Sequence, residues 1–248
     1  MRTNRKNDSN AEQELGKFLD EYCYPHLQFR PDMHWTRSSD PNNLNDQYAG
    51  IDGFLSFNSA NGVREIRTID EKAALQYLNK NLPTFALELS FLERNGITPH
   101  PGWLIDEQKK TDYYLFMWPN AQVDPKTGQT PALNAIKKDD FTFIDASLVS
   151  RKLLKEWLAD QGWTDKRLKE TAESLRKDGI EGPIPTSNKE LHFYCSKGAS
   201  STNVSQRRFA ERPINLIVSR QRLYELSFDT FQIRRSGIKS RKSEVSDN

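Results

Sequence analysis

The sequence predicts an α/β fold in its N-terminal half, followed by an α+β extension. Two observations support this prediction: an amphipathic helical segment precedes two segments in which apolar and polar residues alternate, and further segments of both kinds follow along the chain. The 248 residues include 5 Trp, 8 Tyr and 13 Phe, which supply enough large apolar side chains for a core. This length suits one domain with an appendage.

The first helix is predicted over residues 10–23. Ser9 and Glu12 have the spacing of a capping box, which satisfies free N–H groups at a helix start. Pro25 marks the end of the helix. The apolar residues that recur at helical intervals are Ala11, Leu15, Phe18, Leu19 and Tyr22.

A β-hairpin is predicted next. Apolar and polar residues alternate over residues 50–58, and residues 59–62 (Ser-Ala-Asn-Gly) are typical of a turn. The β-branched residues of 63–72 favour a second strand. Asp52 therefore falls on the first strand, and Asp70 and Lys72 fall at the end of the second.

A helix is predicted over residues 85–96, because Phe85, Leu89 and Leu92 recur at helical spacing before Gly96. The order of elements up to residue 119 is then α-β-β-α-β-β. Two strands are predicted in 101–119 around a charged turn at 106–110, and a loop is predicted over 120–140. Two helices broken at Gly162 are predicted in 147–178. Strands are predicted at 191–195 and 214–219, and the end of the chain from residue 232 is basic and Ser-rich.

Asp70 and Lys72 are two residues apart, so a β-strand places both side chains on one face. Mg²⁺ prefers oxygen ligands and takes only one or two carboxylates, completing its shell with water and phosphate oxygens. A lysine beside it can orient a water molecule or balance negative charge on a phosphate. Asp52, Asp70 and Lys72 are therefore candidate catalytic residues.

The pattern Asp52, then Asp70-Glu71-Lys72, resembles the signature of the PD-(D/E)xK nuclease superfamily. The resemblance covers about residues 10–119. It implies a restriction-endonuclease-like mixed sheet flanked by helices, and a Mg²⁺-dependent hydrolysis of phosphodiester bonds in which Mn²⁺ can replace Mg²⁺. It also implies that Asp52 and Asp70 bind the metal and that Lys72 orients the attacking water.

Two further metal ligands follow from the same resemblance. The peptide carbonyl of Glu71 is one of them. Many members of the superfamily add a glutamate from the first helix, and Glu14, at the edge of the apolar stripe, is the candidate here. The alternative interpretation of the motif is that Asp70 and Lys72 form an exposed pair on the strand that contributes little to stability.

Basic residues are concentrated near the C-terminal end, although the net charge of the whole chain is only +2. Arginine predominates there, and its guanidinium group matches the geometry of phosphate. The candidates for contact with nucleic acid are Arg207, Arg208, Arg220, Arg222, Arg234 and Arg235. The alternative is that this segment is simply a solvated tail.

The predicted organisation is a nuclease core over 10–119, an α+β extension over 120–235 for substrate recognition, and a flexible basic tail over 236–248. No segment has the ~18 uncharged apolar residues of a membrane helix. The N-terminus lacks the apolar region of a secretory signal. Cys23 and Cys195 are too few for a disulfide framework, so a cytoplasmic location is expected.

The function expected from these observations is that of a Mg²⁺-dependent deoxyribonuclease. Enzymes of this class often dimerise to cut two strands, so a homodimer is compatible with the resemblance. A non-catalytic nucleic-acid-binding protein on the same fold is the alternative. An interaction module whose aromatic strands face a protein partner is a third interpretation.

Overall fold

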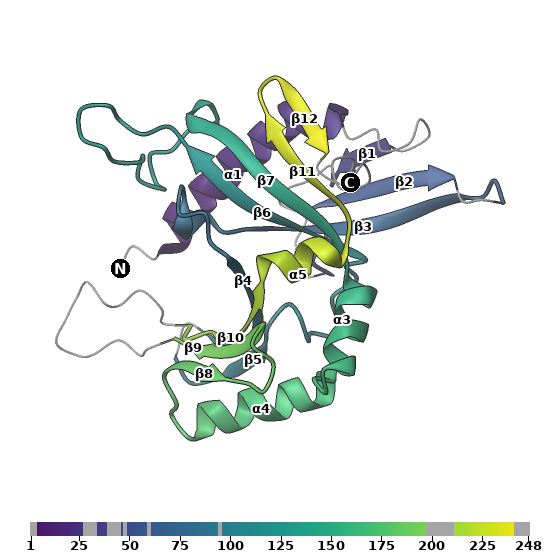
Figure 1. Cartoon of the computed structure of the whole chain (residues 1–248), viewed down its shortest axis with the longest axis vertical. Coiled ribbons are helices and arrows are strands. Elements are labelled where there is room, and N and C mark those ends of the chain that lie inside the picture. Colours follow the sequence, from purple (N-terminus) through teal and green to yellow (C-terminus); the bar gives the residue numbers. More distant parts are fainter. Residues whose placement is uncertain are drawn as a thin grey trace. The chain divides into compact units, whose positions relative to one another are not determined.

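The computed structural model describes residues 4–26, 34–38, 46, 49–58, 61–93, 96–196 and 211–240. It is a mixed α/β structure with two β-sheets, a curled mixed sheet and an antiparallel one (Figure 1). The chain divides into two compact units. Unit 1 comprises Met1–Leu82, Lys110–Arg151 and Leu226–Asn248, and unit 2 comprises Pro83–Lys109 and Lys152–Glu225.

Unit 1 contains a seven-stranded sheet in the order β1-β2-β3-β6-β7-β11-β12. Its strands are β1 (His34–Arg37), β2 (Gly53–Asn58), β3 (Arg64–Ala73), β6 (Tyr113–Ala121), β7 (Phe141–Ser150), β11 (Ser227–Arg234) and β12 (Gly237–Ser240). Strands β3 and β6 are parallel, and the other neighbouring strands are antiparallel. Three short 3-10 helices belong to the described part of this unit: η1 (Tyr24–His26), η2 (Leu75–Tyr77) and η3 (Lys138–Asp140).

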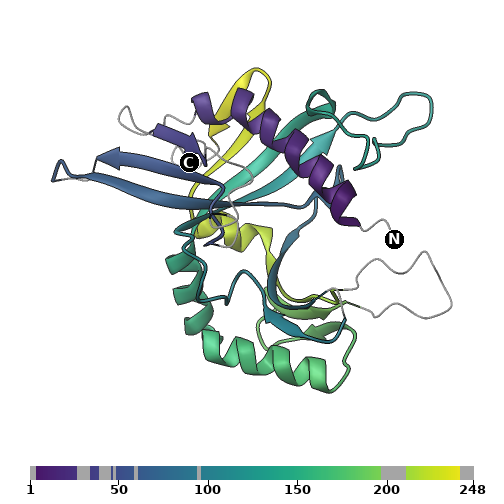
Figure 2. The ribbon, with the colours of Figure 1, turned by 180° about the vertical axis from the view of Figure 1, so that it is seen from behind.

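Helix α1 (Asn4–Tyr22) lies across one face of this sheet, as Figure 2 shows from behind. Its apolar side packs on residues that alternate along the strands, so that every second residue points toward the helix. The residues buried together include Phe18 and Leu19 of α1 with Ile69, Leu115 and Phe231 of the sheet. Burial of each such side chain contributes about 2–3 kcal/mol relative to exposure.

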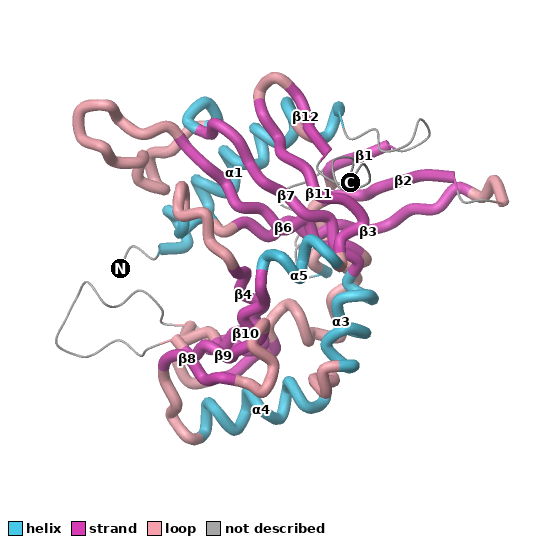
Figure 3. Tube along the Cα trace, in the orientation of Figure 1, coloured by secondary structure: helices cyan, strands magenta, loops and turns pink. Residues whose placement is uncertain are grey.

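Unit 2 contains a five-stranded antiparallel sheet in the order β5-β4-β10-β9-β8. Its strands are β4 (Thr84–Leu92), β5 (Pro99–Pro101), β8 (Gly182–Pro185), β9 (Leu191–Cys195) and β10 (Ile214–Ser219). Figure 3 distinguishes these strands by colour from the helices α3 (Arg151–Asp160), α4 (Asp165–Lys177) and α5 (Arg220–Glu225). Leu87, Leu89, Phe193, Leu216 and Val218 are buried in this sheet.

Several sequence predictions are confirmed. The N-terminal helix is present, but it begins at Asn4, so Ser9 lies inside it and the predicted start at a Ser9–Glu12 capping box is wrong. Strands β2 and β3 form the predicted antiparallel hairpin with Gly53 opposite Ile69. Helices α3 and α4 are separated at Gly162, whose φ of 81° is left-handed. Strands β9 and β10 lie where they were expected.

The predicted helix over residues 85–96 is wrong, because residues 84–92 form β4. Phe85, Leu87 and Leu89 are all buried, which is the period of a strand. Short apolar runs often fit both helical and strand spacing. Here pairing with β10, more than a hundred residues later in the chain, favours the strand.

Other predictions need smaller corrections. The first strand predicted in 101–119 is wrong, because β5 ends at Pro101 and residues 103–105 form a turn, whereas the second is β6. Residues 147–150, expected in a helix, belong to β7. The end expected to be flexible from residue 236 includes β12, which pairs with β11 through a turn at Gly237, and residues 241–248 lie outside the described part. The boundary expected at 119 falls inside β6, because the sheet of unit 1 continues through β7 and β11.

Candidate functional site

Asp52 lies immediately before β2 and is held against β3. Its backbone N–H donates to the carbonyl of Ile69 at 2.8 Å. Its carboxylate oxygen Oδ2 accepts a hydrogen bond from the backbone N–H of Glu71 at 2.7 Å. The preceding Gly50 has a left-handed φ of 68°, and its carbonyl accepts a 2.8 Å hydrogen bond from the Thr111 hydroxyl. This turn directs the Asp52 carboxylate toward the Asp70-Glu71-Lys72 segment.

Asp70 and Lys72 lie on the same face of β3, as the sequence predicted. The Lys72 ammonium donates to Oδ1 of Asp70 at 2.6 Å. The Asp70 side chain is only 5% exposed and that of Lys72 is 23% exposed, so the pair is not a solvated surface pair. The other carboxylate oxygen of Asp70, Oδ2, is buried and has no hydrogen-bond partner among the described residues.

The surroundings of Asp70 raise its pKa to about 6. Burial is the main cause, and the nearby Asp52 carboxylate adds to it, whereas the Lys72 ammonium opposes the shift. In the sheet, Asp70 is opposite Tyr114 and Lys72 is opposite Phe116, and both aromatic residues are fully buried. The low polarity around the carboxylate therefore comes from β6.

This arrangement fits a hard divalent cation. Two carboxylates are close to each other, and one of their oxygens is buried without a partner, which is costly unless a proton or a cation occupies the position. Across the described ranges, no group of three or more His, Cys, Asp or Glu side chains is placed to hold a metal. Mg²⁺ is compatible with such a sparse site because it is often bound through one or two carboxylates.

The side chain of Glu71 points to the opposite face of the sheet, toward α1. There it accepts a hydrogen bond from Arg37 at 3.0 Å, and Arg37 also binds Asp20 of α1 at 2.6 Å. Burial and the neighbouring Asp20 carboxylate raise the pKa of Glu71 to about 8, and Lys72 opposes this shift. The Arg37 guanidinium lies over the ring of Tyr24. The side chain of Glu71 therefore fixes β3 to α1.

Arg37 was not identified from the sequence. It is the last residue of a four-residue strand whose side chains alternate between exposed and half-buried, and nothing in its local pattern distinguishes it from a surface arginine. Its two carboxylate partners come from segments 17 and 34 residues away.

Glu14 lies on α1, which covers the face of the sheet opposite to Asp70. Its Oε1 accepts a hydrogen bond from Lys17 at 2.5 Å, and its Oε2 accepts one from the backbone N–H of Lys138 at 2.8 Å. These bonds lower its pKa, with Lys17 as the main cause. The structure therefore places Glu14 beside η3 and does not bring it together with Asp52 and Asp70.

Two of the predicted nucleic-acid contacts, Arg220 and Arg222, lie in α5 of unit 2 and have partners inside that unit. Arg220 is buried and lies over the ring of Tyr224. Arg222 binds Glu190 at 2.8 Å and Glu225 at 2.7 Å. Arg207 and Arg208 lie outside the described residues.

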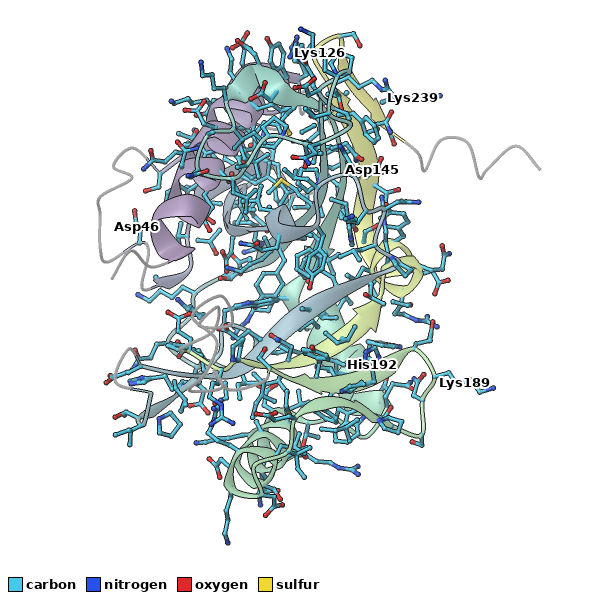
Figure 4. All side chains as sticks on the ribbon, turned by 90° about the vertical axis from the view of Figure 1, so that its left-hand side faces the viewer. Asp46, Lys126, Asp145, Lys189, His192 and Lys239 are labelled. Atoms are coloured by element: carbon cyan, nitrogen blue, oxygen red, sulfur yellow. The ribbon has the colours of Figure 1, made fainter. Side chains whose placement is uncertain are left out.

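Arg234 and Arg235 lie in unit 1, at the end of β11 and in the turn after it, and both are exposed. The guanidinium of Arg234 lies 5.2 Å from the ring centre of Phe143. Arg235 donates to the backbone carbonyl of Asp139. Lys239 projects outward from β12 in the same part of the unit (Figure 4).

A second buried carboxylate, that of Asp145, lies on β7 (Figure 4). Asp145 is opposite Trp118, which shares a sheet face with Tyr114 and therefore with Asp70. Gln232 donates to Oδ1 of Asp145 at 2.9 Å. Asp145 was not identified from the sequence, because the segment before residue 147 lacks strong alternation.

Comparisons with protein-family models, with curated proteins and with solved structures found no match for this chain. None of the helices in the described ranges is long and apolar enough to cross a membrane.

Proposed function

We propose that unit 1 is a Mg²⁺-dependent nuclease of the PD-(D/E)xK type that hydrolyses phosphodiester bonds of DNA. The observation that supports this proposal is the buried, unpartnered Oδ2 of Asp70 between the Lys72 pair and the neighbouring Asp52. If Asp70 and Lys72 formed only a structural ion pair, the Asp52 carboxylate beside them would be unfavourable, because two like charges repel each other.

Asp52 and Asp70 are the residues that would hold the cation. The bound cation would supply Lewis-acid stabilisation of the phosphate and a water of lowered pKa. The Glu71 N–H orients the Asp52 carboxylate, and the Lys72 ammonium orients the Asp70 carboxylate. Lys72, whose side chain is 23% exposed, would also offer a positive charge to a phosphate bound at the cation.

The order of elements around the motif also supports the proposal. Helix α1 precedes the β2–β3 hairpin that carries the motif, and β6 lies parallel to β3 at its other side. This resembles a restriction-endonuclease-like core. The departure is the segment after Lys72, where a strand of unit 2 replaces the expected helix.

The test is a cleavage assay with supercoiled plasmid and linear duplex DNA in Mg²⁺, Mn²⁺ or EDTA. We expect the wild-type protein to cut in either metal and not in EDTA, and Asp70→Asn and Lys72→Ala to lose at least 100-fold in rate. The matched control is Glu65→Gln on the same strand, whose ion pair with Arg67 is partly exposed.

If folded wild-type protein binds the duplex but does not cut it in any metal, the non-catalytic alternative replaces this proposal. If Asp70→Asn and Lys72→Ala cut as fast as Glu65→Gln, the site assignment is wrong.

A further inference from the structure

Arg176, on the last turn of α4 in unit 2, is a half-buried arginine that has no carboxylate partner among the described residues. Its Nη2 donates to the Ser90 hydroxyl at 2.9 Å, and its Nη1 donates to the backbone carbonyl of Arg212 at 3.3 Å. Its Nε is buried and has no hydrogen-bond partner. Buried guanidinium groups are normally neutralised by an acid, so this one is unusual.

A second arginine, Arg212, contacts Arg176 through its backbone carbonyl. Burial lowers the pKa of Arg176, and the charge of Arg212 lowers it further. Arg212 has a carboxylate neighbour, Glu181, but at 3.6 Å and with both side chains about 40% exposed, which contributes little neutralisation. The backbone of Arg212 is left-handed, with φ of 38°, and this conformation places its carbonyl against Arg176.

The elements around Arg176 are well fixed. Ser90 is a buried residue near the end of β4, and it is opposite Ile214 of β10. Helix α4 contacts β4, and its Leu168 and Ala172 are buried. The Arg176 guanidinium, the Ser90 hydroxyl and the backbone of Arg212 are therefore held together before any ligand arrives, which lowers the cost of ordering on binding.

We infer that Arg176, Arg212 and Ser90 form a binding site for a phosphate group. Two guanidinium groups and a hydroxyl offer more donors than the two oxygens of a planar carboxylate can accept, whereas a tetrahedral phosphate presents three or four oxygens. A bound dianion or diester would also remove the repulsion between the two arginines. This inference concerns unit 2 and does not depend on the proposed nuclease chemistry of unit 1.

The first experiment measures the melting temperature of the full chain in inorganic phosphate, in acetate and in chloride at equal ionic strength. We expect phosphate to raise the melting temperature of the wild-type protein by about 3 °C more than either other anion. The shift should disappear in Arg176→Gln and shrink in Arg212→Gln and Ser90→Ala. Lys177→Gln, an exposed charge removal at the next position of α4, is the control and should keep the full shift.

If Arg176→Gln fails to fold, Arg176→Lys replaces it in the experiment. This variant keeps the positive charge and should retain part of the shift in melting temperature. Equal effects of phosphate, acetate and chloride on the wild-type protein would overturn the inference. So would a phosphate effect that is the same in wild-type, Arg176→Lys, Arg212→Gln and Ser90→Ala, because the arginines would then have only a structural role.

A second measurement identifies the source of the phosphate. Fluorescence anisotropy with a labelled DNA duplex in EDTA, on the Asp70→Asn background, reports binding without cleavage. A loss of affinity of threefold or more in Arg176→Lys, but not in Lys177→Gln, assigns the site to a backbone phosphate. Unchanged duplex affinity together with the phosphate-specific shift assigns it to a free or terminal phosphate.

Discussion

The carboxylate of Asp52 accepts a hydrogen bond, at 2.7 Å, from the backbone N–H of Glu71, the residue between Asp70 and Lys72. One aspartate of the candidate site thus ties the turn before β2 to the strand that carries the other aspartate. Side chains at positions 70 and 72 point to one face of β3, while the Glu71 side chain binds Arg37 on the other. The segment is therefore restrained from both faces of the sheet.

The substitutions Asp52→Asn and Asp52→Ala separate the two roles of Asp52. Asn keeps an oxygen that can accept from the Glu71 N–H, so we expect the free energy of unfolding to change by less than ~1 kcal/mol. Ala leaves that partly buried N–H without a partner and should cost about 1–3 kcal/mol. Both should abolish Mg²⁺-dependent cleavage. Urea denaturation and the plasmid assay measure the two effects, and a fully active Asp52→Asn protein would contradict the assignment.

The raised pKa of Asp70 predicts how stability depends on pH without metal. The folded protein holds a proton on Asp70 up to about pH 6, whereas the unfolded chain releases it near its ordinary value of 3.8. Stability therefore falls as the pH rises from about 4 through 6, by up to about 3 kcal/mol from this residue. The comparison is the free energy of unfolding in EDTA at pH 5 and pH 8, for wild-type protein and for Asp70→Asn.

The wild-type protein should lose more stability than Asp70→Asn between these two pH values, and Glu65→Gln should behave like the wild-type protein. Identical pH dependence in all three would show that the Asp70 carboxyl is not perturbed by its surroundings.

Metal binding should reverse this pH effect. A cation competes with the proton for the Asp70 carboxylate, so Mn²⁺ should raise the melting temperature at pH 8 and have little effect at pH 5. Asp52→Asn and Asp70→Asn should lose the response at pH 8. Differential scanning fluorimetry with 5 concentrations of Mn²⁺, on the order of 0.1–10 mM, gives an apparent affinity. A Mn²⁺ effect of equal size in both variants would place the cation elsewhere.

Removal of Arg37 should destabilise the protein through Glu71. In Arg37→Ala the Glu71 carboxylate loses its charged hydrogen-bond donor in a largely buried position, and a cost of about 1–3 kcal/mol is expected. Above about pH 8, where Glu71 would otherwise carry an unpaired charge, the double variant Arg37→Ala with Glu71→Gln should recover part of this loss. Urea denaturation of the four proteins in the cycle measures the coupling, and strictly additive effects would show that the pair does not contribute.

The sequence predicted the local placement of the candidate residues better than it predicted the fold. Strand alternation placed Asp70 and Lys72 on one face, which is a local property of the chain. The same alternation put Asp52 on the neighbouring strand, whereas β2 begins one residue later, at Gly53. Residues 85–96 were misassigned because the same apolar spacing fits a helix, and only the pairing of β4 with β10 favours a strand. Glu14 was misplaced for a similar reason, since the face of the sheet that α1 covers depends on long-range packing.

The contacts that the sequence could not reveal are those between distant segments. Arg37 binds residues on α1 and β3, and Arg176 binds groups from β4 and from the segment before β10. Each arginine looks like an ordinary surface charge in its own segment, and its neighbours are known only when the strands are paired.

The interleaving of the two units has a consequence for synthesis of the chain. Strand β11 pairs with β7 and contributes Phe231 and Ile233 to the core under α1, yet it is translated after every segment of unit 2. Unit 2 can complete its own sheet while unit 1 still lacks a strand and part of its core. The candidate site on β3 therefore reaches its final packing only after residues 227–234 have been synthesised.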